Sequence, residues 1–245
     1  MLRVHNLKKT FGSKHIVADI SFTVNHGQIA VFLGSSGVGK STLLRIFNNL
    51  ESLDGGTITL DGKPLDIGRV NQDHTVGMVF QHSNLFDHLT IEENITLALI
   101  HVMKKSEKDA KDIAHSLLAK YSLLDQANKY PAQLSGGQRQ RVAIIRTLAM
   151  KPKVICFDEP TSALDPLLTN YVAQNLQELA HEGYIILIAT HDTAILDKLD
   201  ATIYLMQDGM IIETANSKEY AKNPRTYPFI HRFVSGDPGY ANASK

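Results

Sequence analysis

The stretch GSSGVGKST, residues 34–42, constrains the fold of this chain more than any other feature. It follows an apolar run, IAVFL, and its last residue, Thr42, begins TLLRIFNNL, whose apolar residues recur at helical spacing. Strand, G-x-x-x-x-G-K-[ST] motif and helix together are typical of a P-loop, in which glycines let the backbone wrap around phosphates. The stretch therefore predicts a nucleotide-phosphate site at the end of a parallel sheet, formed by Gly34, Ser35, Ser36, Gly37, Val38, Gly39, Lys40, Ser41 and Thr42.

Two carboxylates follow a second apolar run, VICF, and they suggest a metal and a base. Within the P-loop, Lys40 is expected to reach the β- and γ-phosphates, and Ser41 to bind Mg²⁺. Adjacent carboxylates at a buried strand end, Asp158 and Glu159, are costly unless a cation compensates. We therefore expect Asp158 to support Mg²⁺ and Glu159 to be the general base that activates water. The alternative is a solvent-exposed acidic strand end without a catalytic role.

Two further strand ends carry polar side chains. A third apolar run, IILIAT, ends at His191, and a fourth, VGMVF, ends at Gln81. In an open α/β sheet, ligands bind outside the carboxyl ends of the strands. We expect His191 to contact the γ-phosphate, against the alternative of a packing histidine. The Gln81 amide could meet both Mg²⁺ and the attacking water, or it could be an ordinary loop glutamine.

The rest of the chain predicts one large domain with an insertion. Residues 1–83 and 150–215 are expected to form an α/β core with an N-terminal antiparallel β layer, because short alternating segments separated by glycines precede the buried runs. Residues 84–149 are expected to form a helical subdomain, with Ser106 as the N-cap of one helix. The tail, residues 216–245, is predicted to be a short helix followed by a loosely packed end.

Composition limits the partners. Lys plus Arg and Asp plus Glu number 25 each, so no overall basic field favours nucleic acid, and we expect no nucleic-acid partner. A single cysteine excludes an intrachain disulfide. We expect neither a secretory signal nor a membrane span, because the longest apolar runs are shorter than the roughly 20 residues that cross a bilayer.

A second glycine turn, LSGGQ at residues 134–138, raises a separate question. Ser135 and Gln138 are spaced as a capping box, so the turn should begin a helix whose free backbone N–H groups attract an anion. It has no lysine, so it looks like half of a phosphate site. It could be a plain helix cap, bind a different anion, or complete a nucleotide site on a second copy of the chain. The arginines that follow, Arg139, Arg141 and Arg146, are interpreted as a solvated or hinge face.

These motifs together resemble the ATP-binding subunits of ABC transporters, from Leu2 to about Val234. The resemblance implies a RecA-like P-loop NTPase fold and a homodimer that encloses ATP and Mg²⁺. It adds Phe11 as the residue that stacks on adenine, where a tyrosine is more usual. It also implies that ATP lies between the P-loop of one subunit and residues of its partner, namely Ser135, Gly136, Gly137, Gln138 and Asp165.

Within this family the chain is most similar to the bacterial polar amino acid importers of the glutamine or arginine type. Those usually read FNLFPH, whereas this chain has Ser83 and Asp87 in place of the first aromatic and the proline. The resemblance implies permease partners bound through residues 82–94, a solute-binding protein, and a peripheral location at the cytoplasmic face of the plasma membrane. Alternatives are a cell-division, lipoprotein-release or methionine-import complex, a regulatory partner in such a complex, and an ABC protein acting on ribosomes or DNA.

Overall fold

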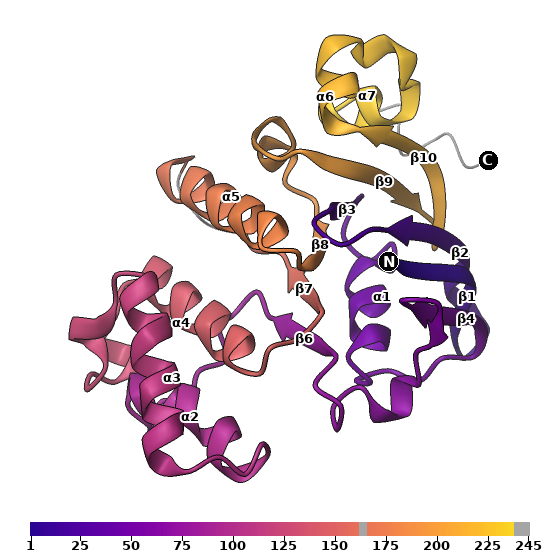
Figure 1. Ribbon diagram of the computed structural model, residues 1–245. Coiled ribbons are helices and arrows are strands. Elements are labelled where there is room, and N and C mark those ends of the chain that lie inside the picture. Colours follow the sequence, from indigo (N-terminus) through magenta and orange to yellow (C-terminus); the bar gives the residue numbers. More distant parts are fainter. Residues whose placement is uncertain (162–165, 238–245) are drawn as a thin grey trace.

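The computed structural model describes residues 1–161 and 166–237, with only the backbone of residues 166–168 (Figure 1). Its strands are β1 Leu2–Phe11, β2 Lys14–Val24, β3 Ile29–Leu33, β4 Gly55–Leu60, β5 Lys63–Pro64, β6 Val76–Val79, β7 Val154–Asp158, β8 Ile185–Thr190, β9 Ala201–Gln207 and β10 Met210–Asn216. Its α-helices are α1 Lys40–Phe47, α2 Ile91–His101, α3 Glu107–Lys120, α4 Gly136–Ala149, α5 Pro166–His181, α6 Ser217–Lys222 and α7 Pro228–Val234. Short 3-10 helices cover Ile67–Arg69, Leu124–Gln126, Pro131–Gln133, Thr193–Lys198 and Pro224–Thr226.

The larger sheet has six strands in the order β10-β9-β3-β8-β7-β6. Strands β9, β3, β8, β7 and β6 are parallel, and β10 joins the edge antiparallel to β9. Every residue of β3, β7 and β8 is buried, which explains why these strands read as unbroken apolar runs. These three strands are neighbours, so the polar residues predicted after them meet at one edge of the sheet, as expected.

The smaller sheet is antiparallel, in the order β2-β1-β4-β5, and confirms the predicted N-terminal layer. Its strands alternate between buried and exposed residues, so only one face packs against the core. That core contains an aromatic group in which the Phe22 ring lies 4.9 Å from Phe32 and 5.6 Å from Tyr204, measured between ring centroids. Helix α1 packs into the same core, through Leu43 and Phe47 among others.

Helices α2, α3 and α4 pack against one another on the side of the molecule away from the antiparallel layer (Figure 1). Ser106 caps α3 as predicted, accepting a hydrogen bond from the Asp109 N–H. The first turn of α4 follows the segment that leads from α3, whereas its last turn packs against β6. There Gly77 permits close contact, since a Cβ at this position would lie 2.4 Å from Thr147 Cγ2.

The tail differs from the expectation of a single short helix and a loose end. It forms two helices, α6 and α7, which pack against the last strands of the large sheet (Figure 1). Ile230 of α7 is fully buried, and its N–H donates to Glu213 Oε2 on β10 at 2.6 Å. The apolar residues of the tail recur at helical spacing, and their burial offsets the entropy lost when the tail becomes ordered.

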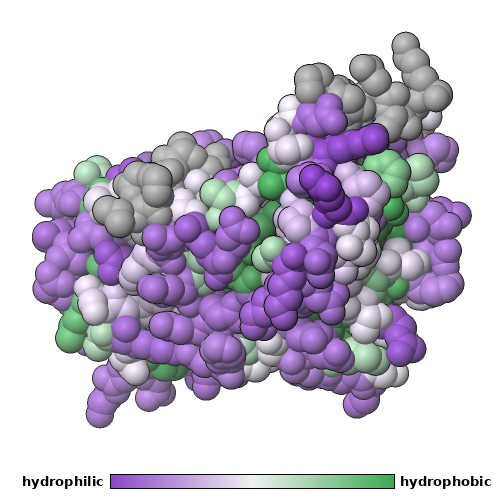
Figure 2. Space-filling view, turned by 90° about the horizontal axis from the view of Figure 1, so that it is seen from above, coloured by the Kyte–Doolittle hydropathy of each residue, from purple (hydrophilic) through white to green (hydrophobic). Residues whose placement is uncertain are grey.

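The described parts of the chain contain no helix that is both long and apolar enough to cross a bilayer. The face drawn in Figure 2 is mostly hydrophilic, with hydrophobic residues in small patches between polar ones.

Candidate functional site

The P-loop has a backbone conformation that its glycines make possible. Gly34 and Gly39 have φ values of +153° and +106°, in the region that favours glycine. A Cβ would lie 2.5 Å from the Met206 carbonyl oxygen at Gly34, and 2.2 Å from the Ile16 carbonyl oxygen at Gly39. The loop therefore fits against the core only with glycine at both positions, and it leads directly into α1.

Lys40 begins α1 and is held by the loop that it follows. Its Nζ donates to the carbonyl oxygens of Gly34 at 2.7 Å and Ser35 at 2.8 Å. Burial lowers the pKa of the Lys40 ammonium, while the nearby Glu159 and Asp158 carboxylates oppose that shift. A phosphate oxygen beside Nζ would favour the charged ammonium, because it supplies the counter-charge that a desolvated cation requires.

Ser41 and Asp158 are joined, although 117 positions separate them in the sequence. The Ser41 Oγ donates to Asp158 Oδ1 at 2.7 Å. Burial raises the pKa of the Asp158 carboxyl, which the Ser41 hydrogen bond partly offsets. A divalent cation at this hydroxyl–carboxylate pair would favour the ionised carboxylate, so the donor set suits Mg²⁺.

Glu159 has a left-handed backbone, with φ +50°, at the turn after β7. Its N–H donates to the Ala189 carbonyl at 2.8 Å, which fixes the turn to the neighbouring strand β8. Its carboxylate accepts from Thr190 Oγ1 at 3.1 Å and lies 2.8 Å from His191 Nδ1. A non-glycine residue in this conformation stores strain, which is typical of functional sites. The turn therefore aims one carboxylate into the region that the P-loop faces.

These elements surround one cavity of about 390 Å³, here called the nucleotide cavity. It unites the ends of four strands with the P-loop, as the sequence predicted for an open α/β sheet. Its lining residues are Phe11, Ile16, Ser36, Gly37, Gly39, Lys40, Ser41, Thr42, Gln81, Glu159 and His191.

Three predicted P-loop residues do not line the nucleotide cavity. Gly34 and Ser35 contribute through their carbonyls, which hold Lys40. The Val38 side chain packs instead against the core beside Gly34. Phe11 does line the cavity and is 45% exposed, with Lys9 Nζ 4.9 Å from its ring centroid. A ring exposed at the rim of a cavity offers a flat apolar face on which a planar base could stack.

The LSGGQ turn, here called the signature turn, forms the predicted capping box at the start of α4. The Gln138 N–H donates to Ser135 Oγ at 3.3 Å, and the Ser135 N–H donates to Gln138 Oε1 at 2.8 Å. None of the residues 135–138 is among the described residues that line the nucleotide cavity. Gly136 lines a separate groove of about 420 Å³, together with Gln81 and Pro160 among others. The turn thus does not close around its own chain's P-loop.

The three arginines of α4 are bound more firmly than a solvated face would be. Arg139 Nη1 donates to the Leu134 carbonyl at 2.6 Å, and Arg141 Nη1 donates to the Tyr121 carbonyl at 3.1 Å. Arg146 Nη1 donates to the Asn84 carbonyl at 2.8 Å, and burial lowers the pKa of its guanidinium. These partly buried side chains hold backbone carbonyls outside α4, which agrees with the hinge alternative of the prediction better than with a solvated face.

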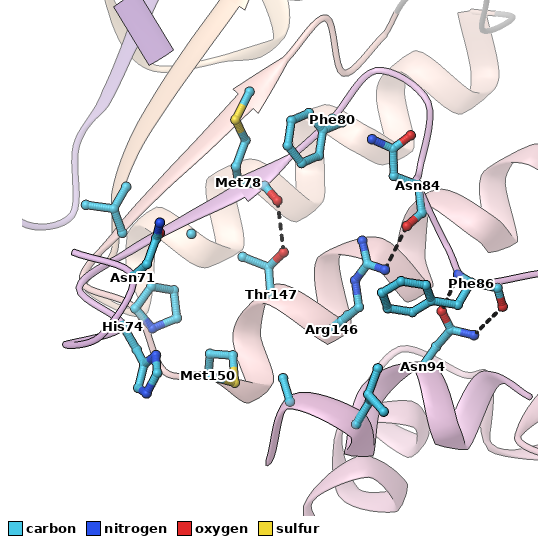
Figure 3. Close-up of a pocket in the computed structure, with 15 residues that line it drawn as sticks. Asn71, His74, Met78, Phe80, Asn84, Phe86, Asn94, Arg146, Thr147 and Met150 are labelled. Atoms are coloured by element: carbon cyan, nitrogen blue, oxygen red, sulfur yellow. Dashed lines mark hydrogen bonds between the residues drawn. The ribbon is translucent and has the colours of Figure 1, made fainter. Parts of the chain in front are cut away.

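Another cavity, of about 410 Å³, lies between β6, α4 and the segment after Gln81 (Figure 3). Phe86 is held on its wall although it is 43% exposed. Its ring centroid lies 5.6 Å from the Arg146 guanidinium, and Asn94 forms hydrogen bonds to the Phe86 N–H at 2.7 Å and carbonyl at 3.1 Å. This surface is mostly apolar and is ordered by hydrogen bonds from both α2 and α4.

Two residues of the nucleotide cavity region, Thr190 and Ile16, were not predicted from the sequence. Thr190 orients Glu159 by a hydrogen bond, and the signal was a hydroxyl at the end of a buried run, next to His191. Ile16 lines the cavity from β2, and no local pattern identifies it, because the fold alone brings it beside Gly39. The predicted Asp165 lies outside the described residues.

Comparisons with known proteins agree with this geometry. The family model described as ABC transporter matches residues 17–162. The chain is 46% identical to the glutamate transport ATP-binding protein GluA of Corynebacterium glutamicum, over 92% of this chain and 95% of that protein. It is 43% identical to the glutamine transport ATP-binding protein GlnQ of Geobacillus stearothermophilus, over 96% of this chain and 100% of that protein.

Solved structures give the same result for the fold. CbiO1 of Clostridium perfringens, part of the transporter complex cbiONQ, has a TM-score of 0.82 at 31% identity, covering 92% of both chains. The ATP-binding cassette MJ0796, solved as a dimer in a post-hydrolysis state with ADP and Pi, has a TM-score of 0.77 at 31% identity. That match covers 89% of this chain and 99% of MJ0796.

Proposed function

The chain belongs to the ABC transporter family as one of its ATP-hydrolysing cassettes, and from this premise we propose that it powers the import of a polar amino acid. The observation that carries the proposal is the nucleotide cavity, where Lys40, Glu159 and His191 converge from three separate strand ends. The names of the relatives support the solute class, since they include transport proteins for glutamate, glutamine and arginine.

In the proposed assembly, two copies pack head to tail and share two nucleotides. Each ATP contacts the P-loop of one copy and Phe11 beside it, and the signature turn of the other copy. Asp165 of the second copy would lie at the same interface. The separation of the signature turn from its own nucleotide cavity supports this arrangement, because the exposed N-terminus of α4 then faces the partner's phosphates. A C2 dimer of this kind has two equivalent sites.

Glu159 is the general base of the proposed reaction. Its carboxylate takes a proton from water as the water oxygen attacks the γ-phosphorus, and the bond from that phosphorus to the bridging oxygen breaks to give ADP and phosphate. Thr190 and His191 support this role, because both contact the Glu159 carboxylate and restrict its position. Lys40 stabilises the negative charge of the β- and γ-phosphates.

Mg²⁺ would be held by Ser41, Asp158 and Gln81, together with the phosphates. The hydrogen bond from Ser41 to Asp158 and the presence of Gln81 on the cavity wall support this set of oxygen ligands. When bound, the ion neutralises phosphate charge.

Transport requires a membrane partner, and the cavity beside Phe86 is where we place its contact (Figure 3). The segment of residues 82–94 begins directly after Gln81, so a partner seated there would sense the nucleotide cavity through a short connection. The partner would be a permease that receives its amino acid from a solute-binding protein. The cassette itself would then lie peripherally at the cytoplasmic face of the plasma membrane.

The test of the ATPase assignment is the Glu159→Gln substitution. Removal of the base should lower kcat at least 100-fold while MgATP still binds, because the P-loop is untouched. Glu182→Gln is the control, since Glu182 is exposed and pairs with Lys120 away from the cavity. Unchanged turnover in Glu159→Gln would show that the assigned base is wrong.

The solute class has a separate test in cells. Deletion of the gene should lower the uptake of labelled glutamate, glutamine or arginine, and the wild-type gene but not Glu159→Gln should restore it. If uptake of all three were unaffected while the purified protein hydrolysed ATP, the amino acid assignment would fail and the ATPase assignment would stand.

A further inference from the structure

The groove that holds Gly136, Gln81 and Pro160 on its walls separates the signature turn from the catalytic core. A hydrogen bond joins α4 to the core across it: the side-chain amide of Gln140 donates from Nε2 to the Pro160 carbonyl at 2.5 Å. Gln140 lies three and four positions after Gly137 and Gly136, so all three occupy one face of the helix. A shift of that face therefore moves the glycines of the signature turn and the Gln140 amide together.

The acceptor of this hydrogen bond is the carbonyl directly after Glu159. Pro160 is buried and has no N–H, so its carbonyl is the sole backbone hydrogen-bonding group that it offers. On the other side of Glu159, the N–H of that residue is fixed to Ala189 at 2.8 Å. The left-handed turn at Glu159 is thus held at its start by the parallel sheet and at its end by α4. A displacement of Gln140 would therefore change the direction in which the Glu159 carboxylate points.

Other contacts fasten α4 to its surroundings, but they do not reach this turn. Arg141 donates to Tyr121 and lies 5.2 Å from the Tyr171 ring centroid, and Arg146 donates to Asn84. Among the hydrogen bonds of the described residues, the one from Gln140 is what links α4 to residues 159–160.

We propose that Gln140 is a positioning residue that couples the two nucleotide sites of the dimer. The inference rests on the proposed head-to-tail assembly, in which the signature turn serves the partner's ATP while Glu159 serves the chain's own. When ATP in the partner draws the signature turn toward it, Gln140 transmits the displacement to the Pro160 carbonyl and so to Glu159. Each site thereby reports its occupancy to the other through a single side chain.

The first test replaces Gln140 with methionine, which has a similar length and helix propensity but no donor. Gln140→Met should lower kcat about five- to tenfold, the factor expected for one lost net hydrogen bond, and leave the MgATP affinity of the monomer within twofold. Gln174→Met, on the exposed face of α5, is the matched control and should change neither value. Gln140→Lys supplies a hydrogen-bond donor again and should have a higher kcat than Gln140→Met. If the loss in Gln140→Met came only from altered packing, Gln140→Lys would be equally slow.

The second test measures coupling directly, with mixed dimers isolated through two different tags. In one dimer, a Gln140→Met chain pairs with a Glu159→Gln chain, so the working base lies in the chain that lacks the amide. In the other, one chain carries both substitutions and its partner is unchanged. The working Glu159 then belongs to the unchanged chain, and the signature turn at its ATP belongs to the chain that lacks the Gln140 amide. Coupling predicts that both are about fivefold slower than a dimer with Glu159→Gln alone in one chain.

The outcomes separate the inference from the function on which it rests. If only one of the two mixed dimers were slow, Gln140 would affect a single nucleotide site, and the proposed coupling between the sites would be overturned. The dimer with Glu159→Gln alone in one chain is the reference for both comparisons. If that dimer had no measurable activity, the test would be the kcat of the Gln140→Met homodimer, and a wild-type kcat would overturn the inference. Loss of ATP hydrolysis or of ATP-driven dimers in the unsubstituted protein would instead contradict the proposed assembly.

Discussion

The chain has two glycine-containing turns, the P-loop and the signature turn, and the reasons for glycine differ between them. In the P-loop, Gly34 and Gly39 have positive φ values, and a side chain at either would collide with backbone of the same chain. In the signature turn, Gly136 lies in the first turn of an ordinary helix. The nearest atom to a Cβ there would be the end of the flexible Arg139 side chain, at 3.9 Å.

This difference shows where each requirement arises. The P-loop needs glycine so that the loop can pack against the core of its own chain, whereas nothing described in the chain's own fold needs glycine at position 136. Glycine costs about 1 kcal/mol relative to alanine in a helix interior and less in the first turn, where Gly136 lies, so the expected cost here is a fraction of that. A residue that weakens its own helix without a local reason indicates close approach by something outside the chain. The proposed partner nucleotide supplies that reason.

The largest effect should follow a substitution in the P-loop. Gly39→Ala would place a Cβ 2.2 Å from the Ile16 carbonyl oxygen and force the loop to move, so we expect at least a 100-fold loss of MgATP affinity by calorimetric titration. Gly183→Ala is the control, because Gly183 also has a positive φ, +95°, but no atom within 4 Å of the added Cβ. It should cost roughly 1 kcal/mol of stability and leave affinity unchanged. Wild-type affinity in Gly39→Ala would refute the steric argument.

The matching substitution in the signature turn should separate folding from function. Gly136→Ala should keep the MgATP affinity of the monomer and raise the thermal stability slightly, since alanine favours the helix. ATP hydrolysis and ATP-driven dimerisation should nevertheless fall at least tenfold, because the methyl group would occupy the space in front of the partner's phosphates. Light scattering with and without MgATP measures the dimer. A variant that hydrolyses and dimerises normally would make the signature turn a plain helix cap.

Features of the site that are set by a local sequence pattern could be predicted, and features that depend on packing between distant segments could not. The P-loop, Asp158, Glu159 and His191 could be located because each ends or follows a buried strand whose apolar run is visible in the sequence. Ile16 could not, since its place beside Gly39 depends on how β2 crosses the core. The capping box of α4 was visible as S-x-x-Q, but the hydrogen bond from Gln140 to Pro160 joins two segments whose packing no local pattern encodes. The second helix of the tail is a different case: its apolar residues do recur at helical spacing, but a helix this short is stable only because Ile230 is buried against the core.

The contact between Gly77 of β6 and Thr147 of α4 allows a test of how strongly α4 is held against the sheet. Gly77→Ala would bring a Cβ to 2.4 Å from Thr147 Cγ2, so we expect a loss of about 1–3 kcal/mol in the free energy of unfolding, measured in urea. Thr147→Ser removes that methyl group and keeps the hydroxyl that donates to the Ala143 carbonyl at 3.0 Å. The double variant should therefore recover most of the loss. Additive losses would mean that this contact does not limit the packing.

The smallest effect compares two capping boxes of the same design. Thr90 caps α2 and exchanges hydrogen bonds with Glu93 at 2.7 and 3.2 Å, as Ser135 does with Gln138 at the start of α4. Thr90→Ala and Ser135→Ala should each cost about 1 kcal/mol of stability by chemical denaturation, because each leaves one helix N–H without its acceptor. They should differ in function: only Ser135→Ala should raise the ATP concentration needed for half-maximal dimerisation, since its hydroxyl faces the partner's nucleotide in the proposed dimer. An equal shift in both variants would show that helix stability, and not the position of the hydroxyl, sets the ATP requirement.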